Sequence, residues 1–428
     1  MTSRELFGRP LISRRFVGAW LVLVATIPLA LRSYFIRDRL SLFAWKPGEM
    51  MGINYRVYHH AAELALDGEP FYNAPPTQAF DWAVYLYPPG TLPLYYPFTF
   101  VKWTTGYTIL TGLSILAAVA GTFLLVDYVE SVGPRLGWVD AGIIFLAFLL
   151  STHSFGTVYF GNINLMLALG IVFGFWALHR NREIASGVAF GIVALFKLFP
   201  ALIGLWLLRT RRFRAVGAAL ATGIGGLLAG IALFGLDTTV FYFTEVVANR
   251  TDSSLFVGGY PVEGTYYVTV QQPVSWAVAA VWPTAPYSVI VLVSVLVVVP
   301  TVAFLYRNVE TTMDRQMAIF ATLAAMVTLL PSFRWYLVFL YVPMVTLLYL
   351  WRPSRSRQLF VAGGVLLSVT FSSGSVVDAL SVLPAPLYSV AYAVGGAGVL
   401  PLYGILLMVL ACLWEKRCSS TKQAQSPA

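Results

Sequence analysis

The sequence has little charge for its length. Only 11% of its 428 residues are charged, whereas 58% are hydrophobic and the mean hydropathy is +0.75. A soluble protein of this length could not bury so much apolar surface. We therefore expect a multi-pass membrane protein.

Cysteine and histidine are also scarce. The 2 cysteines, Cys412 and Cys418, lie close together near the C-terminus, and the chain has 4 histidines. This composition excludes a disulfide framework and shows no metal-ligand spacing. We expect no metal and no other cofactor.

The net charge of +9 has a simpler explanation than nucleic-acid binding. The basic residues form short clusters between apolar runs, which is the pattern of cytoplasmic loops in membrane proteins. We expect no nucleic-acid partner, and the clusters predict that both termini are cytoplasmic.

The apolar runs predict an all-α bundle of about twelve transmembrane or partial helices. The first run is too long for a signal-peptide core and is interpreted as a retained helix. The long runs are 16–36, 104–126, 163–179, 214–235, 287–306, 335–351 and 394–414, and the shorter ones are 140–152, 316–331 and 358–372.

The apolar stretch 184–208 is flanked on both sides by basic clusters, "HRNR" and "RTRRFR". If both flanks are cytoplasmic, the chain must enter the membrane and return, as two helical segments of about 12 residues and roughly 18 Å each. Such segments are too short to cross a hydrocarbon core of about 30 Å, and they are tolerated there only when protein surrounds them. Proline in "FKLFP" predicts the turn, with Lys197 at the apex.

The predicted external face carries two long loops, 37–103 and 236–286, and a tight turn at 153–162. Within the first loop, residues 54–67 have the spacing of an amphipathic helix lying in the membrane interface. The second loop is rich in glycine and polar residues and predicts a mobile cap. We interpret residues 1–418 as a single membrane domain and 419–428 as a disordered cytoplasmic tail.

Several motifs occur in a fixed order: "NYRVYHHAAELALDGEPFYN", "YLYPPG", "GNIN" and "ASGVAFGIVALFKLFPALI" followed by a basic cluster. Together they resemble glycosyltransferase family 87, over roughly residues 50–215, with a weaker similarity at "PSFRWYLVFLYVP". The resemblance implies a GT-C-like membrane fold and inverting transfer of a hexose, with mannose as the expected sugar. It also implies a polyprenyl-phosphate donor in the outer leaflet and a lipid-linked or glycan acceptor.

The resemblance further implies a carboxylate as general base in the first external loop, beginning a "D-x-x-V-Y" stretch. The matching residue here is Asn54, which cannot accept a proton near neutral pH. Asn54 could instead bind sugar hydroxyls. Glu49 and Asp81 are alternative bases, although each could also be a solvated surface charge.

A buried cation is needed to neutralise the donor phosphate, and Lys197 is the first candidate. Its alternative role is to extend toward the lipid headgroups. Arg334 and Arg56 are further phosphate candidates, or charges that anchor at the interface and face water.

The sugar and acceptor could contact polar and aromatic residues of the same face. Aromatic rings can stack on sugars or anchor at headgroups, and asparagines at bilayer depth can stabilise a turn or present amides to a ligand. The candidates are Tyr55, Tyr58, His59, Tyr87, His153 and Asn162.

Two other functions remain open from the sequence. A transporter of lipid or lipid-linked sugar would also have broken helices, but it commonly has repeated halves, which we do not find. A catalytically impaired relative is suggested by Asn54. The leading prediction is a hexosyltransferase of the cell membrane with its active face outside.

Overall fold

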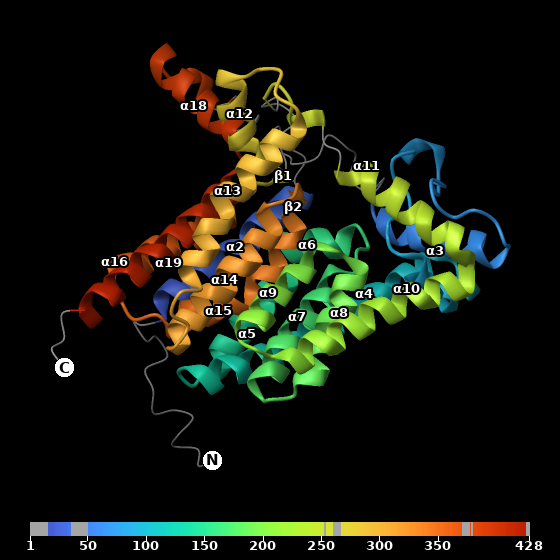
Figure 1. The fold of residues 1–428 in the computed structure, drawn as a ribbon, viewed down its shortest axis with the longest axis horizontal. Helices are drawn as coiled ribbons and strands as arrows, with labels where there is room; N and C mark the ends of the chain where they lie inside the picture. Colours follow the sequence, from blue (N-terminus) through green and yellow to red (C-terminus); the bar gives the residue numbers. More distant parts are fainter. Residues whose placement is uncertain are drawn as a thin grey trace. The chain divides into compact units, whose positions relative to one another are not determined.

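The computed structural model describes residues 16–35, 50–251, 254–259, 267–369, 377 and 380–424 (Figure 1). The described residues form seventeen α-helices, several short 3₁₀ and π turns and one two-stranded sheet. In the sheet, β1 (Tyr267–Val268) pairs antiparallel with β2 (Ser332–Phe333). The predicted helical fold is confirmed for these residues.

The chain divides into two compact units, which we describe separately. The first unit comprises Met1–Leu42, Leu125–His153 and Ser254–Ala428, and the second comprises Phe43–Leu124 and Ser154–Ser253. The boundaries cut through α4 (Trp103–Val132) and α6 (Thr152–Tyr159). The single domain predicted for 1–418 stays a prediction.

In the first unit, α2 packs on α5 and α16, and α14 contacts α13, α15 and α19. The elements of this unit are α2 (Val17–Phe35), α5 (Trp138–Leu150), η5 (Ser254–Phe256), α12 (Gln271–Val281), α13 (Tyr287–Leu305), α14 (Thr312–Thr328), η6 (Arg334–Leu340), α15 (Tyr341–Leu350), α16 (Arg355–Leu367), η7 (Leu380–Val382), α18 (Ala385–Ala397) and α19 (Leu400–Ala424).

In the second unit, α8 packs between α7 and α10, and η2 contacts both α3 and α10. Its elements are α3 (Ile53–Leu66), η1 (Gln78–Phe80), η2 (Pro89–Phe100), α7 (Asn164–His179), α8 (Glu183–Phe196), η3 (Phe199–Leu202), α9 (Ile203–Arg209), α10 (Phe213–Phe241), η4 (Tyr242–Val247) and α11 (Ala248–Thr251).

Three described helical segments are long and apolar enough to cross a membrane: α4, Phe213–Val247 and α13. The number of spans rises to 5 if the bent pairs α5–α6 and α18–α19 each form one. The structure therefore agrees with a multi-pass membrane protein. The total of about twelve segments stays a prediction, because the remaining apolar helices are shorter.

The stretch around Lys197 turns back on itself, as the flanking charges predict. A Cβ atom on Gly187 of α8 would lie 2.2 Å from the Ala215 carbonyl oxygen of α10. A Cβ atom on Gly226 of α10 would lie 2.3 Å from the Leu195 side chain of α8. The two contacts advance in the same direction along both helices, so α8 and α10 are parallel.

Parallel neighbours require the chain between them to return. The segment formed by η3 and α9 makes this return, and the Arg212 guanidinium at the start of α10 lies 2.9 Å from the Glu183 carboxylate at the start of α8. Lys197 therefore lies at the opposite end of α8 from this ion pair.

The described structure differs locally from three expectations. Residues 153–162 are mostly helix α6, and the turn is confined to 160–163. The expected loop 236–286 begins with the end of α10 and the turn η4, and it contains α12. Helix α19 continues to Ala424, into the tail expected to be disordered, and no glycine or proline occurs between Ile405 and Ala424.

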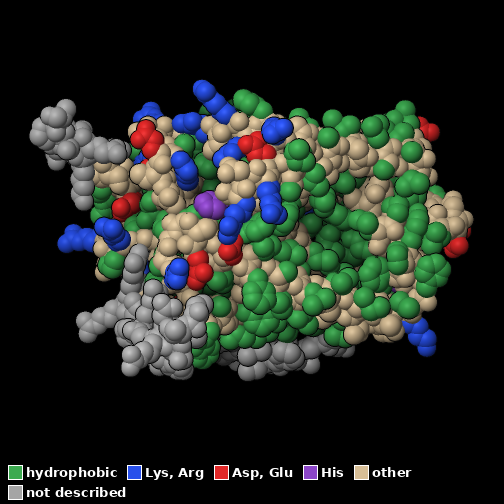
Figure 2. Space-filling model, turned by 90° about the horizontal axis from the view of Figure 1, so that it is seen from below, with side chains coloured by type: hydrophobic (Ala, Val, Ile, Leu, Met, Phe, Trp, Pro, Cys, Tyr) green, Lys and Arg blue, Asp and Glu red, His purple; other side chains and the backbone are tan. Residues whose placement is uncertain are grey.

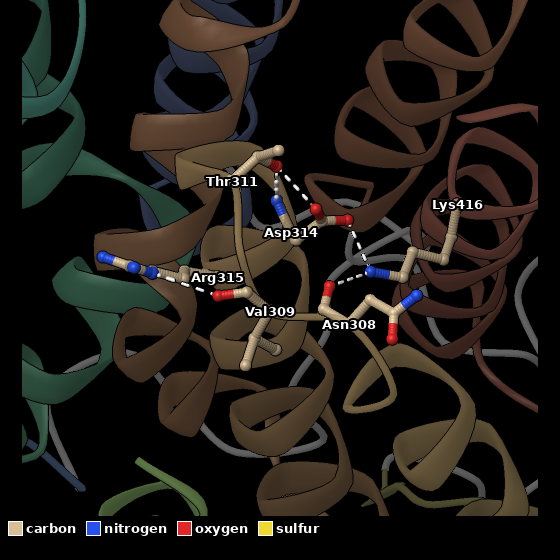
Figure 3. A network of polar contacts seen from close by, with 6 residues as sticks. All are labelled: Asn308, Val309, Thr311, Asp314, Arg315 and Lys416. Carbon is tan, nitrogen blue, oxygen red and sulfur yellow. Dashed lines mark hydrogen bonds and ion pairs between the residues drawn. The ribbon is translucent and has the colours of Figure 1, made fainter. Parts of the chain in front are cut away.

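A polar network joins α19 to the connection between α13 and α14 (Figure 3). Lys416 Nζ lies 2.6 Å from Asp314 Oδ1 and donates to the Asn308 carbonyl oxygen. Asp314 also accepts a 2.6 Å hydrogen bond from the Thr311 hydroxyl, which caps α14. The network therefore satisfies a lysine that is only 4% exposed.

Candidate functional site

Lys197 is placed where α8 ends. Its backbone is extended (φ −139°, ψ 118°) between α8 and η3, and the side chain is 8% exposed. The ammonium group lies 5.5 Å from the centroid of the Tyr87 ring. A cation over an aromatic face is attracted by the ring quadrupole, most strongly when little water is present.

Tyr87 connects Lys197 to helix α3. The Tyr87 hydroxyl is 2.9 Å from the Tyr58 hydroxyl of α3, and the Tyr58 ring stacks on Tyr95 of η2 at 4.8 Å. Three predicted site residues, Lys197, Tyr87 and Tyr58, are thus brought together from segments far apart in the sequence. Tyr95 was missed, although the aromatic density of "YLYPPGTLPLYYPF" could have indicated it.

Asn54 lies in the first turn of α3, next to the turn between α6 and α7. Its backbone N–H donates to the Phe160 carbonyl at 2.9 Å, and the N–H of Gly52 donates to the Tyr159 carbonyl at 2.8 Å. Asn162 follows in the same turn, where its side chain accepts from the N–H of Asn164 at 3.2 Å. The structure therefore gathers Asn54 and Asn162 into one region.

Close backbone approach makes this junction possible. Gly161 has φ +68°, and a Cβ atom there would lie 2.8 Å from the Tyr55 Cβ. Glycine is the residue that adopts this left-handed conformation without strain.

Tyr55 is part of the packing between α3 and α4. It is 0% exposed, and its hydroxyl occupies the space left by Gly106. Burial, followed by the nearby Glu63 carboxylate, raises the pKa of Tyr55 to about 12. This burial leaves Tyr55 no surface on which a sugar could stack.

His59 and Arg56 already have partners on and near α3. His59 Nδ1 lies 3.3 Å from Glu63, and its Nε2 lies 3.2 Å from the Val101 carbonyl oxygen. The Arg56 guanidinium lies 5.1 Å from the centroid of the Trp103 ring. These contacts favour structural roles, and the i,i+4 spacing of His59 and Glu63 could have predicted the first.

Of the two candidate bases, the structure describes only Asp81. Asp81 is exposed at the end of η1, whereas Glu49 lies outside the described residues.

His153 and Arg334 belong to the first unit and lie beside each other there. His153 is 0% exposed, and its ring is 6.4 Å from that of Tyr341. Arg334 is 9% exposed at the start of η6. Both are more deeply buried than interface anchors would be.

Among the residues that the structure describes, no group of three or more His, Cys, Asp or Glu side chains could hold a metal ion.

Comparison with known proteins identifies the family of the chain. The model of glycosyltransferase family 87 matches residues 85–333, which include Tyr87, Asn162 and Lys197 but not Asn54. A polyprenol-phosphate-mannose-dependent alpha-(1-2)-phosphatidylinositol mannoside mannosyltransferase of Mycolicibacterium smegmatis is 24% identical over 210 residues, which cover 46% of this chain and 47% of that protein. The match therefore spans about half the length of this relative. Because the family model matches more than half of the chain, the protein belongs to glycosyltransferase family 87.

Proposed function

We propose that this membrane glycosyltransferase transfers mannose from a polyprenyl-phosphate donor to a lipid-linked or glycan acceptor. The observation that carries the proposal is the position of Lys197, a lysine with 8% exposure at the apex of a returning helix pair. The relative from Mycolicibacterium smegmatis supports the choice of sugar and donor through its name.

The proposed chemistry is a single displacement with inversion. The acceptor hydroxyl gives its proton to a general base and attacks the anomeric carbon, while the polyprenyl phosphate leaves from the opposite face of the sugar. Lys197 would stabilise the negative charge that grows on the leaving phosphate, because an ammonium group donates charge-assisted hydrogen bonds to phosphate oxygens. Asn54 and Asn162 would present amides to the sugar hydroxyls from the adjoining turn.

We further propose that the apex with Lys197 faces the outside of the cell membrane and that both termini are cytoplasmic. The basic clusters at the other end of α8 support this orientation, because arginine-rich connections are retained on the cytoplasmic side. The acceptor would then be reached from the external face.

The role of Lys197 is tested with Lys197→Ala and Lys197→Arg. We expect Lys197→Ala to lower transfer from radiolabelled polyprenyl-phosphate mannose by about 10²-fold or more, the scale for loss of a group that stabilises developing charge. Lys197→Arg should retain part of the activity, because it keeps the positive charge. Activity like that of the wild type in a folded Lys197→Ala protein would contradict the proposal, as would movement of labelled lipid across a bilayer without transfer.

The base is tested with Glu49→Gln, Asp81→Asn and Asn54→Asp. We expect one of the first two changes to lower kcat by about 10²–10⁴-fold, the range for loss of a general base. If neither does and Asn54→Asp instead increases the rate, the natural chain is a catalytically impaired member of the family.

A further inference from the structure

Two helix connections of the second unit have the same backbone. In the first connection, from α7 to α8, Asn181 has φ 58° and the N–H of Arg182 donates to the Ala177 carbonyl at 2.8 Å. In the second connection, from α9 to α10, Arg211 has φ 55° and the N–H of Arg212 donates to the Leu207 carbonyl at 2.9 Å. The two connections are therefore structural copies of each other.

Both connections lie at the same end of the second unit. Arg212 of the second connection bonds Glu183 at 2.9 Å and the Asn181 side chain at 3.3 Å in the first. Within 179–183 and 209–214 the chain has six arginines and one carboxylate, Glu183, which is bound to Arg212. The pair of connections therefore carries a concentrated positive charge.

Two of the arginines share one aromatic ring. The guanidinium carbons of Arg180 and Arg182 lie 5.9 Å and 5.6 Å from the centroid of Trp176. Placing two like charges on one indole ring is unfavourable in itself, and an anion bound between them would offset the repulsion. Guanidinium groups held on a ring also keep their N–H donors in the planar arrangement that matches a phosphate.

Apolar surface continues from the basic end along the helices. Ile184 and Val188 of α8 are 60% and 38% exposed, and Phe213 and Leu220 of α10 are 64% and 59% exposed. On the face seen from below, Figure 2 shows Lys and Arg side chains with some Asp and Glu side chains among them, and apolar side chains beside them. A ligand with an anionic head and apolar chains would match both surfaces.

We infer that the paired connections form a binding site for an anionic phospholipid of the leaflet at this end. Arg180 and Arg182 hold the phosphate of the headgroup over Trp176, and the acyl chains lie along the exposed faces of α8 and α10. The site is at the opposite end of α8 from Lys197, so it is separate from the proposed donor site.

The test uses the purified full-length protein and native mass spectrometry with added phosphatidylglycerol or phosphatidylcholine. We expect adducts with phosphatidylglycerol and a loss of about tenfold or more in their affinity in Arg180→Gln/Arg182→Gln, because hydrogen bonds to charged groups are lost. Arg352→Gln/Arg355→Gln is the matched control, since these exposed arginines lie in the other unit and should leave the adducts unchanged.

Trp176→Leu is a second variant, which keeps both arginines and removes the aromatic ring that they contact, and it should also weaken the adducts. This variant provides the test if the double arginine variant does not fold. Equal retention of phosphatidylglycerol in the wild type and in the folded variants would overturn the inference. Displacement of the lipid by inorganic phosphate alone would overturn the lipid assignment, because the acyl chains would then contribute nothing.

Discussion

At the scale of single residues, a charge in an apolar setting was the most informative signal. Lys197 stands out in the sequence because an ionised lysine inside an apolar stretch requires a partner. The structure supplies the Tyr87 ring, 5.5 Å away. The role of Tyr55 could not be predicted from the sequence in this way, because an aromatic residue can lie in a core or on a binding surface. Only its neighbours in the folded structure show which of the two applies.

The ring of Tyr87, more than its hydroxyl, should hold the Lys197 ammonium in place. We expect Tyr87→Leu to raise KM for the donor by up to about 30-fold, since a desolvated cation–π contact contributes about 2 kcal/mol. Tyr87→Phe keeps the ring and loses only the hydrogen bond to Tyr58, so its effect should be smaller. Steady-state kinetics measure KM for the donor in both variants. Equal KM values for Tyr87→Leu and Tyr87→Phe would contradict this role of the ring.

At the scale of secondary structure, the basic clusters flanking 184–208 predicted that the chain returns near Lys197. The spacing of residues 54–67 predicted helix α3. Residues 54–67 were expected to be helical, and α3 runs from Ile53 to Leu66. The turn expected at 153–162 is confined to 160–163. In the structure His153, Ser154 and Thr157 are buried in helix α6.

Helix α4 offers a matched test of how closely α3 and α4 approach. A Cβ atom on Gly106 would lie 1.7 Å from the Tyr55 hydroxyl, whereas one on Gly112 of the same helix would meet nothing within 4 Å. We expect Gly106→Ala to destabilise the protein by about 1–3 kcal/mol, as overpacking does.

Gly112→Ala is the control and should be neutral or stabilising by up to about 1 kcal/mol, because alanine favours helix. Thermal unfolding in detergent measures both changes. Equal unfolding temperatures for the two variants would show that the Tyr55 contact is not tight.

At the scale of the whole chain, composition and family membership agree on a multi-pass membrane glycosyltransferase. The sequence predicted only that the C-terminus is cytoplasmic. The structure gives Lys416 a structural role, because its ion pair with Asp314 is almost fully buried and joins the last helix to the α13–α14 connection.

Removal of this ion pair should lower the stability of the whole first unit. We expect Lys416→Met to cost about 3–5 kcal/mol, since it leaves the Asp314 carboxylate buried without its cation. The double variant Lys416→Met/Asp314→Asn should recover part of the loss, and Arg352→Gln, at an exposed position, should have little effect. Thermal unfolding is the measurement, and an unchanged transition in Lys416→Met would contradict the importance of the network.

The sequence by itself determined the class of the protein, the basic ends of its helices and the return of the chain at Lys197. These features follow from hydropathy and charge, which act on each segment largely independently of the others. Only the tertiary structure decided that Tyr87 and Tyr58 accompany Lys197, that Tyr55 is core and that Lys416 is paired. Such outcomes depend on contacts between residues far apart in the chain, and local composition does not encode which of several similar side chains will meet.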